Sequence, residues 1–158
     1  MLPLAGDRVP HVFLREPFYE TQPRFSPTGA WLAFASNRSG RPEIYVQSYP
    51  EPSRRWQIST DGGQDPMWAG NGRELFYRSG DKVMSVAIAR GPTFQASTPR
   101  LLFAGDYARA APPIEMDVHP DGQRFLMLQS SRPELPVTHI NVVLNWFEEL
   151  KRRLPTAE

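Results

Sequence analysis

The stretch Gln22–Val46, QPRFSPTGAWLAFASNRSGRPEIYV, alternates tight turns with short apolar runs. A Ser-Pro-Thr-Gly turn ending at Gly29 precedes the run Trp31–Phe34, and an Asn-Arg-Ser-Gly turn leads to the run Ile44–Val46. Short apolar runs between turn signals are typical of strands that are buried on both faces. The stretch therefore predicts antiparallel strands joined by hairpins, and it raises the question of whether the pattern recurs.

The pattern recurs twice more along the chain. Aligned on Gly29, Gly72 and Gly122, the copies read QPRFSPTGAWLAFAS, DPMWAGNGRELFYRS and EMDVHPDGQRFLMLQ. Threonine, asparagine or aspartate precedes the glycine, which suits a turn that ends with positive φ. Four strands in roughly 40 to 50 residues is the repeat of a β-propeller blade, whereas a Greek-key sandwich would not place the same turn at each repeat. The further strands that we expect are Glu43–Gln47, Arg55–Ile58, Val83–Ile88, Arg100–Phe103 and Ile140–Leu144.

The repeated residues resemble the TolB-like (WD40-like) β-propeller repeat. Its turn and hairpin motifs appear here as Pro23–Gly29, Ser36–Gly40 and Ile44–Val46, and the third copy keeps His119–Gly122. The second copy departs from the motif, because Ala69-Gly70 replaces Ser-Pro. More narrowly, the chain resembles the C-terminal propeller region of bacterial serine/threonine protein kinases. The residues that carry this narrower resemblance are Trp56–Gly63, Gly72–Tyr77 and Val143–Trp146.

The resemblance implies an all-β fold built from blades of four antiparallel strands. The parent would have six blades, so residues 1–158 would form a single partial propeller of about three blades, half of the ring. The blades are expected at 20–62, 63–105 and 112–145. Residues 1–19 would supply outer strands of a preceding or swapped blade. Residues 146–154 would form a short closing helix, since their apolar side chains share one helical face.

An open half ring would expose apolar faces at both ends, which soluble monomers seldom do. One solution is a homodimer in which two copies complete a six-bladed ring. The strand around Val9–Leu14 of one copy would then complete the last blade of the other. The alternative is a fragment of a longer chain that is stable only with its other blades.

Composition narrows the classes of partner. The 158-residue chain has a net charge of +1, so electrostatics favour neither nucleic acid nor an anionic membrane. It has no cysteine, which excludes disulfides, and its apolar runs are too short for membrane insertion. The N-terminus MLPLAGDRVP lacks the features of a signal peptide. We expect a cytoplasmic location if this chain is expressed alone, and a periplasmic or other extracytoplasmic one if it belongs to a receptor kinase.

Sequence motifs of catalysis are absent. The chain contains no Gly-x-Ser-x-Gly, no His-Glu-x-x-His, no phosphate-binding Walker loop and no protein-kinase motif. The segment Asp117–Asp121 could present two carboxylates and an imidazole to a metal, but the repeat register places His119 and Asp121 in a turn, where aspartate bonds its own backbone. We therefore expect no catalytic residues, no metal and no cofactor.

Several polar residues lie where the first strand of each unit begins, and these strands would line the central channel of a propeller. Binding residues concentrate on loops at such a rim, although solvated polar residues are the ordinary alternative. The candidate binding residues are Glu20, Gln22, Arg24, Gln64, Asp65, Glu115 and Asp117.

The four tryptophans could form a carbohydrate platform, but the repeat register favours the core. Trp31, Trp68 and Trp146 are expected in the core, and Trp56 is the one most expected at the surface. Arg38, in the hairpin after the second strand, is expected to stack or form ion pairs across blades.

These features favour a non-catalytic binding, scaffold or sensor module that recognises a protein or peptide. Two alternatives remain open. One is the gating propeller of a prolyl-oligopeptidase-like hydrolase. The other is a metal-dependent lactonase-type propeller, for which Asp65 and Asp117 are available as ligands.

Overall fold

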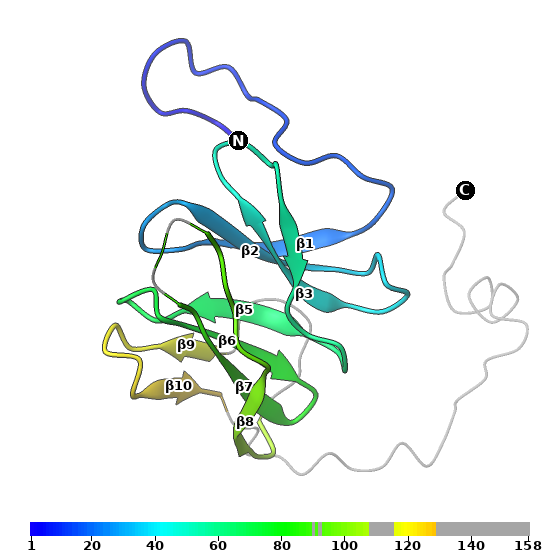
Figure 1. The fold of residues 1–158 in the computed structure, drawn as a ribbon, viewed down its shortest axis with the longest axis vertical. Helices are drawn as coiled ribbons and strands as arrows, with labels where there is room; N and C mark the ends of the chain where they lie inside the picture. The colour runs from blue at the N-terminus through cyan, green and yellow to red at the C-terminus, as the bar shows by residue number, and fades with distance from the viewer. Residues whose placement is uncertain (90, 92, 108–115, 129–158) are drawn as a thin grey trace, which may run out of the picture.

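The computed structural model describes residues 1–89, 91, 93–107 and 116–128, and its regular secondary structure is entirely β (Figure 1). None of the described residues forms a helix that could span a membrane. The first antiparallel sheet has the order β1-β2-β3-β4, from β1 (Glu20–Phe25), β2 (Trp31–Ser36), β3 (Glu43–Ser48) and β4 (Arg55–Gln57). The second has the order β5-β6-β7-β8, from β5 (Gln64–Trp68), β6 (Glu74–Ser79), β7 (Lys82–Ala87) and β8 (Arg100–Ala104). The remaining pair is β9 (Met116–Val118) with β10 (Phe125–Met127).

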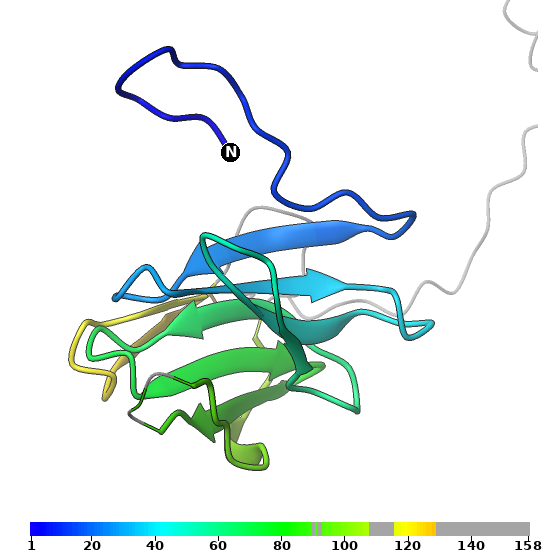
Figure 2. The same ribbon diagram turned by 45° about the horizontal axis from the view of Figure 1, so that its top comes forward.

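The three units are layered in chain order. Figure 2 shows the two four-stranded sheets face to face, with the N-terminal segment in dark blue on the far side of the first sheet. The first strands of successive units are neighbours, because β1 contacts β5 and β5 contacts β9. The predicted four-stranded antiparallel units are thus confirmed for the first two repeats. The described residues do not form a closed ring.

The inner strands β2, β3 and β6 are buried on both faces, as the apolar runs predicted. Because side chains alternate along a strand, Ala33 and Ala35 of β2 face the second sheet, where they join Leu75 and Tyr77 of β6 in one core cluster. Their neighbours Leu32 and Phe34 face the opposite way and pack with Tyr45 against Phe13 and Leu14 of the N-terminal segment. The second sheet packs its other face on β9 and β10, mainly through Met67, Val83, Met116 and Phe125.

The three turns that defined the repeat are the same in structure. Gly29, Gly72 and Gly122 have φ values of 71°, 67° and 71°, the region that favours glycine. In each turn the glycine amide donates to the carbonyl oxygen three residues earlier, at 2.8 Å. The side-chain oxygen of the residue before each glycine accepts a hydrogen bond from the backbone amide two residues further along. The acceptor and donor pairs are Thr28 with Ala30, Asn71 with Arg73, and Asp121 with Gln123.

Asp121 is therefore a turn residue, as the repeat register predicted. The amide of Gln123 donates to its Oδ1 at 2.9 Å, and this hydrogen bond is the main cause that lowers the pKa of Asp121. Arg124 donates from Nη2 to Oδ2 at 3.0 Å, so the carboxylate already has a cationic partner.

The departure of the second copy from the motif has a steric explanation. A Cβ atom on Gly70 would lie 2.5 Å from the carbonyl oxygen of Pro120, in the equivalent turn of the third unit. The second turn therefore meets the third too closely for a proline or serine at this position. Gly70 allows the contact between neighbouring units.

Gly70→Ala is expected to lower the free energy of unfolding by about 1–3 kcal/mol, because the added methyl group overpacks this contact. Urea denaturation measures the effect. The backbone of Gly70 is not in the positive-φ region, so in open space the same change would stabilise the chain by about 0.4–1 kcal/mol. A stabilised variant would show that the second and third turns do not meet.

The structure differs from the sequence-based expectations at Trp56 and in residues 1–19. Trp56 is not a surface aromatic: it is half-buried, with its ring 4.9 Å from that of Phe94 and 5.5 Å from that of Trp31. The expectation was wrong because Trp56 pairs with Val46, and the segment after β7 returns Phe94 over that face. Residues 1–19 contain no strand in the isolated chain, so pairing of this segment in a swapped blade stays a prediction. The strand expected at 140–144 and the helix expected at 146–154 lie outside the described residues.

Candidate functional site

Gln22 and Asp65 occupy the same position in the first strands of the two sheets, and both have unusual backbones. Their φ values are 56° and 52°, and each precedes a proline, Pro23 or Pro66. Left-handed backbone is uncommon for residues with a side chain, and it costs roughly 1–3 kcal/mol. At each site the strand register shifts, as in a β-bulge, so the bulge turns these side chains away from the regular ladder.

The two strained residues bind each other. The Gln22 side-chain amide donates from Nε2 to Oδ1 of Asp65. In return, the backbone amide of Asp65 donates to Oε1 of Gln22 at 3.0 Å. Gln22 thus pairs with both the side-chain oxygen and the backbone amide of Asp65. The bulge leaves these two groups outside the strand-to-strand hydrogen bonds. This reciprocal pair joins the first strands of both sheets at one point.

Arg24 lies beside this pair and contributes to the same junction. Its carbonyl oxygen accepts a hydrogen bond from the indole Nε1 of Trp68 at 3.1 Å. Its half-buried side chain folds back, and Nη1 donates to the carbonyl oxygen of Pro23 at 3.2 Å. A cation therefore lies next to the bulge that presents Gln22.

The other predicted rim residues are more dispersed. Glu20 is half-buried at the start of β1, where Ser36 donates to its Oε1 at 3.4 Å. Gln64 is exposed at the start of β5, opposite Arg78. Asp117 is exposed on β9, and its Oδ1 accepts the amide of Val118 at 2.8 Å. Glu115 lies outside the described residues. The structure thus brings Gln22, Arg24 and Asp65 together.

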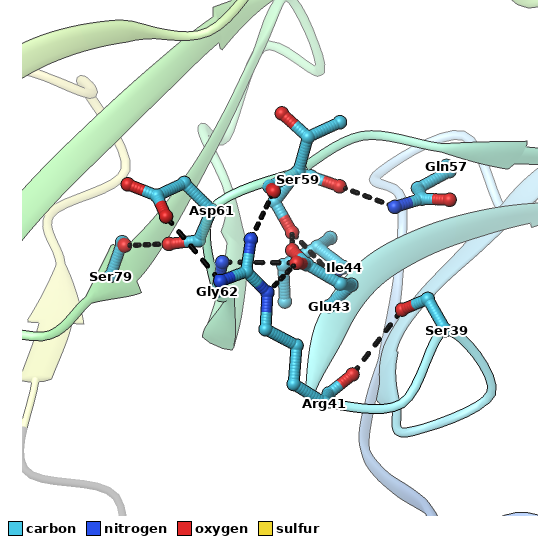
Figure 3. Close-up of polar contacts among 10 residues, drawn as sticks. Ser39, Arg41, Glu43, Ile44, Gln57, Ser59, Asp61, Gly62 and Ser79 are labelled. Carbon is cyan, nitrogen blue, oxygen red and sulfur yellow. Dashed lines mark hydrogen bonds and ion pairs between the residues drawn. The ribbon is translucent and has the colours of Figure 1, made fainter.

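A buried carboxylate, which the sequence analysis did not identify, holds the chain that leads to Asp65 (Figure 3). Glu43, at the start of β3, is 1% exposed. Its Oε2 accepts the hydroxyl of Ser59, whose Oγ also accepts the amide of Ile44 at 2.8 Å. Its Oε1 accepts the amide of Gly62 at 3.0 Å and Nε of Arg41 at 2.8 Å. One carboxylate therefore fixes the connection between the two sheets.

Further contacts tie the same connection to both sheets. Arg41 also donates to the carbonyl oxygen of Thr60 and lies 3.5 Å from the carboxylate of Asp61. Ser79, at the end of β6, donates to the carbonyl oxygen of Asp61 at 2.6 Å. We call the group of Arg41, Glu43, Ser59 and Gly62 the latch. Because β5 starts at Gln64, directly after this connection, the latch helps to position Asp65.

The side chains that the structure brings together carry hydrogen-bonding and charged groups. Within the described ranges no three His, Asp or Glu side chains are grouped so that they could hold a metal ion. Gln22, Arg24 and Asp65 place a carboxamide, a guanidinium and a carboxylate on two joined strands. Such groups can form hydrogen bonds to a peptide backbone and ion pairs with its charged side chains.

Comparisons with known proteins add no relative: no protein-family model matches the chain, and no curated protein matches it.

Proposed function

We propose that the chain is a non-catalytic binding module, part of a TolB-like β-propeller, which recognises a protein or peptide at the rim formed by its first strands. The proposal rests chiefly on the bond between Gln22 and Asp65, because both residues keep a strained backbone at equivalent places. Strain of this kind is concentrated at ligand-binding and active sites. The association with a bacterial serine/threonine kinase belongs to the same proposal and rests on the sequence resemblance.

The charges at the rim indicate which peptides would bind best. Glu20, Asp65 and Asp117 lie on the first strands, and Arg24 is the one cation among the predicted rim residues in the described part. Exposed charges steer association and select partners more than they add affinity. A peptide with a Lys or Arg side chain flanked by free backbone amides is therefore the preferred ligand.

A library of random peptides, selected on the immobilised full chain, tests this proposal. We expect selected peptides to be enriched in Lys or Arg, and Asp65→Asn to weaken their binding about tenfold, which corresponds to about 1.4 kcal/mol. Asn keeps the shape of the side chain, and circular dichroism checks that the variant is folded. Binding constants are measured by isothermal titration calorimetry.

Asp81→Asn is the matched control, because Asp81 is an exposed carboxylate in the hairpin between β6 and β7. It should leave peptide affinity unchanged. If Asp65→Asn binds as tightly as the original chain, or if both variants lose affinity equally, the rim is not the binding site.

A further inference from the structure

The repeat register shows which face of each unit receives the preceding unit. Leu32, Leu75 and Phe125 occupy the third position after the turn glycine. Leu75 packs in the core shared with the first sheet, and Phe125 packs against the second sheet, with its ring 4.9 Å from that of Phe76. Leu32 is the equivalent residue of the first sheet. Its face is therefore the one on which a preceding unit would pack.

The next position in the register marks the opposite face. Ala33 of β2 packs toward the second sheet, and Phe76 of β6 contacts Phe125 of β10. The equivalent residue of the third unit is Leu126, which is 70% exposed. The third unit thus presents an uncovered apolar side chain at the position that meets the following sheet in both other units.

The N-terminal segment, and not another sheet, covers the face of the first sheet around Leu32, with Phe13 and Leu14 packed on it. A groove of about 490 Å³ runs between this face and the N-terminal segment, and Phe25, Leu32 and Phe34 line its floor. Phe25 is 47% exposed. The segment covers the groove loosely, since Val12, which lines it, remains 73% exposed.

The charged groups beside this face are already compensated within one chain. Glu16 lies 2.9 Å from Nη1 of Arg55 and 3.3 Å from Nη1 of Arg38. The Arg38 guanidinium also stacks over the rings of Phe18 and Tyr45, at 5.6 Å and 5.9 Å from their centroids. An apolar surface can therefore dock here without burying an unpaired cation.

We propose that these two faces bind each other between two copies of the chain. The first-sheet face of one copy, with Phe25 and Leu32, would receive the third-unit face of the other, with Leu126. The contact continues the same register as the two interfaces between units within one chain. This dimer rests on the proposed propeller fold. Two head-to-tail contacts can close into a dimer only if the repeats are arranged in a ring. Residues 9–14, which cover the groove in the single chain, would be displaced from it.

Light scattering on the full chain across a dilution series tests the proposal. We expect twice the mass of one chain for the original sequence, and the mass of one chain for both Leu126→Asp and Phe25→Asp. Leu101→Asp is the matched control, because Leu101 is 55% exposed on β8, away from both faces, and it should remain a dimer. A folded chain that is monomeric at every concentration, or a dimeric Leu126→Asp variant, would overturn the proposal.

Mixing the two interface variants gives a sharper test. In a head-to-tail ring, the mixture restores one unaltered contact, between the first-sheet face of the Leu126→Asp chain and the third-unit face of the Phe25→Asp chain. We expect a mixed dimer that neither variant forms alone. A mixture that stays monomeric contradicts head-to-tail packing. Peptide binding at the rim is measured separately on the monomeric Leu126→Asp variant, because Gln22 and Asp65 belong to the same chain. Failure of the dimer and failure of the binding function are therefore distinguishable.

Discussion

Glu43→Ala is expected to lower the free energy of unfolding by about 2–6 kcal/mol, because it leaves two hydrogen-bond donors without their acceptor, at about 1–3 kcal/mol each. The change leaves the Ser59 hydroxyl and the Gly62 amide without their acceptor, and it removes the carboxylate that Arg41 binds at 2.8 Å. Glu43 is 1% exposed, so water cannot easily replace the carboxylate. Urea denaturation monitored by tryptophan fluorescence gives the stability of both chains.

Two further variants separate the causes of this loss. Glu51→Ala, at an exposed glutamate, should stay within about 0.5 kcal/mol of the original chain. A double-mutant cycle of Glu43→Ala with Ser59→Ala should give a coupling of about 0.5–3 kcal/mol, because the two side chains are in contact. If Glu43→Ala costs no more than Glu51→Ala, the latch does not hold the connection between the sheets.

Glu43→Gln connects this latch with the proposed binding site. The amide keeps the shape of the side chain, but one of its two acceptor oxygens becomes a donor, so a hydrogen bond from Ser59 or Gly62 is lost. Peptide affinity at the rim should fall even where the variant is fully folded, because the connection leads directly into β5 and Asp65. An unchanged affinity would show that the latch stabilises the fold without positioning the rim.

Much of the fold follows from local signals in the sequence. The turn glycines require positive φ, and Thr28, Asn71 and Asp121 can cap the turn with their own oxygens, so three separate segments fold alike. The apolar runs after these turns then predict strands buried on both faces, and β2 and β6 have that burial pattern. These features depend on a few neighbouring residues, which is why the repeat could be predicted without a structure.

The candidate site depended on contacts that local signals do not encode. Gln22 and Asp65 were predicted as rim residues, but their direct bond requires the two sheets to be placed side by side. A glutamate at the start of a strand suggests an exposed residue, whereas Glu43 is buried because the chain after β4 folds back over it. The repeated Gln-Pro and Asp-Pro pairs were the one available sign of the bulges, since a residue before proline is restricted in its backbone.

Raising the pH from 10 to 12 is expected to destabilise the chain by up to about 3 kcal/mol through Tyr77 alone, at 1.36 kcal/mol for each pKa unit. Tyr77 is 3% exposed, and burial, followed by the charges of Glu43 and Asp61, raises its pKa from 10.0 to about 12. Below pH 10 the phenol is neutral in both folded and unfolded chains, so its contribution is constant. Above pH 10 the unfolded chain ionises first, and the folded state loses stability until the folded pKa is reached.

Stability measured by urea denaturation at intervals from pH 9 to pH 12 tests this expectation. Tyr77→Phe should remove most of the alkaline decrease, whereas Tyr19→Phe, at a tyrosine that is 79% exposed, should leave it unchanged. Glu43→Gln removes one of the negative charges that raise the pKa of Tyr77, so its stability should level off at a lower pH than that of the original chain. If Tyr77→Phe and the original chain lose stability in parallel, Tyr77 ionises equally well in the folded and unfolded states, and the core between the two sheets is open to water.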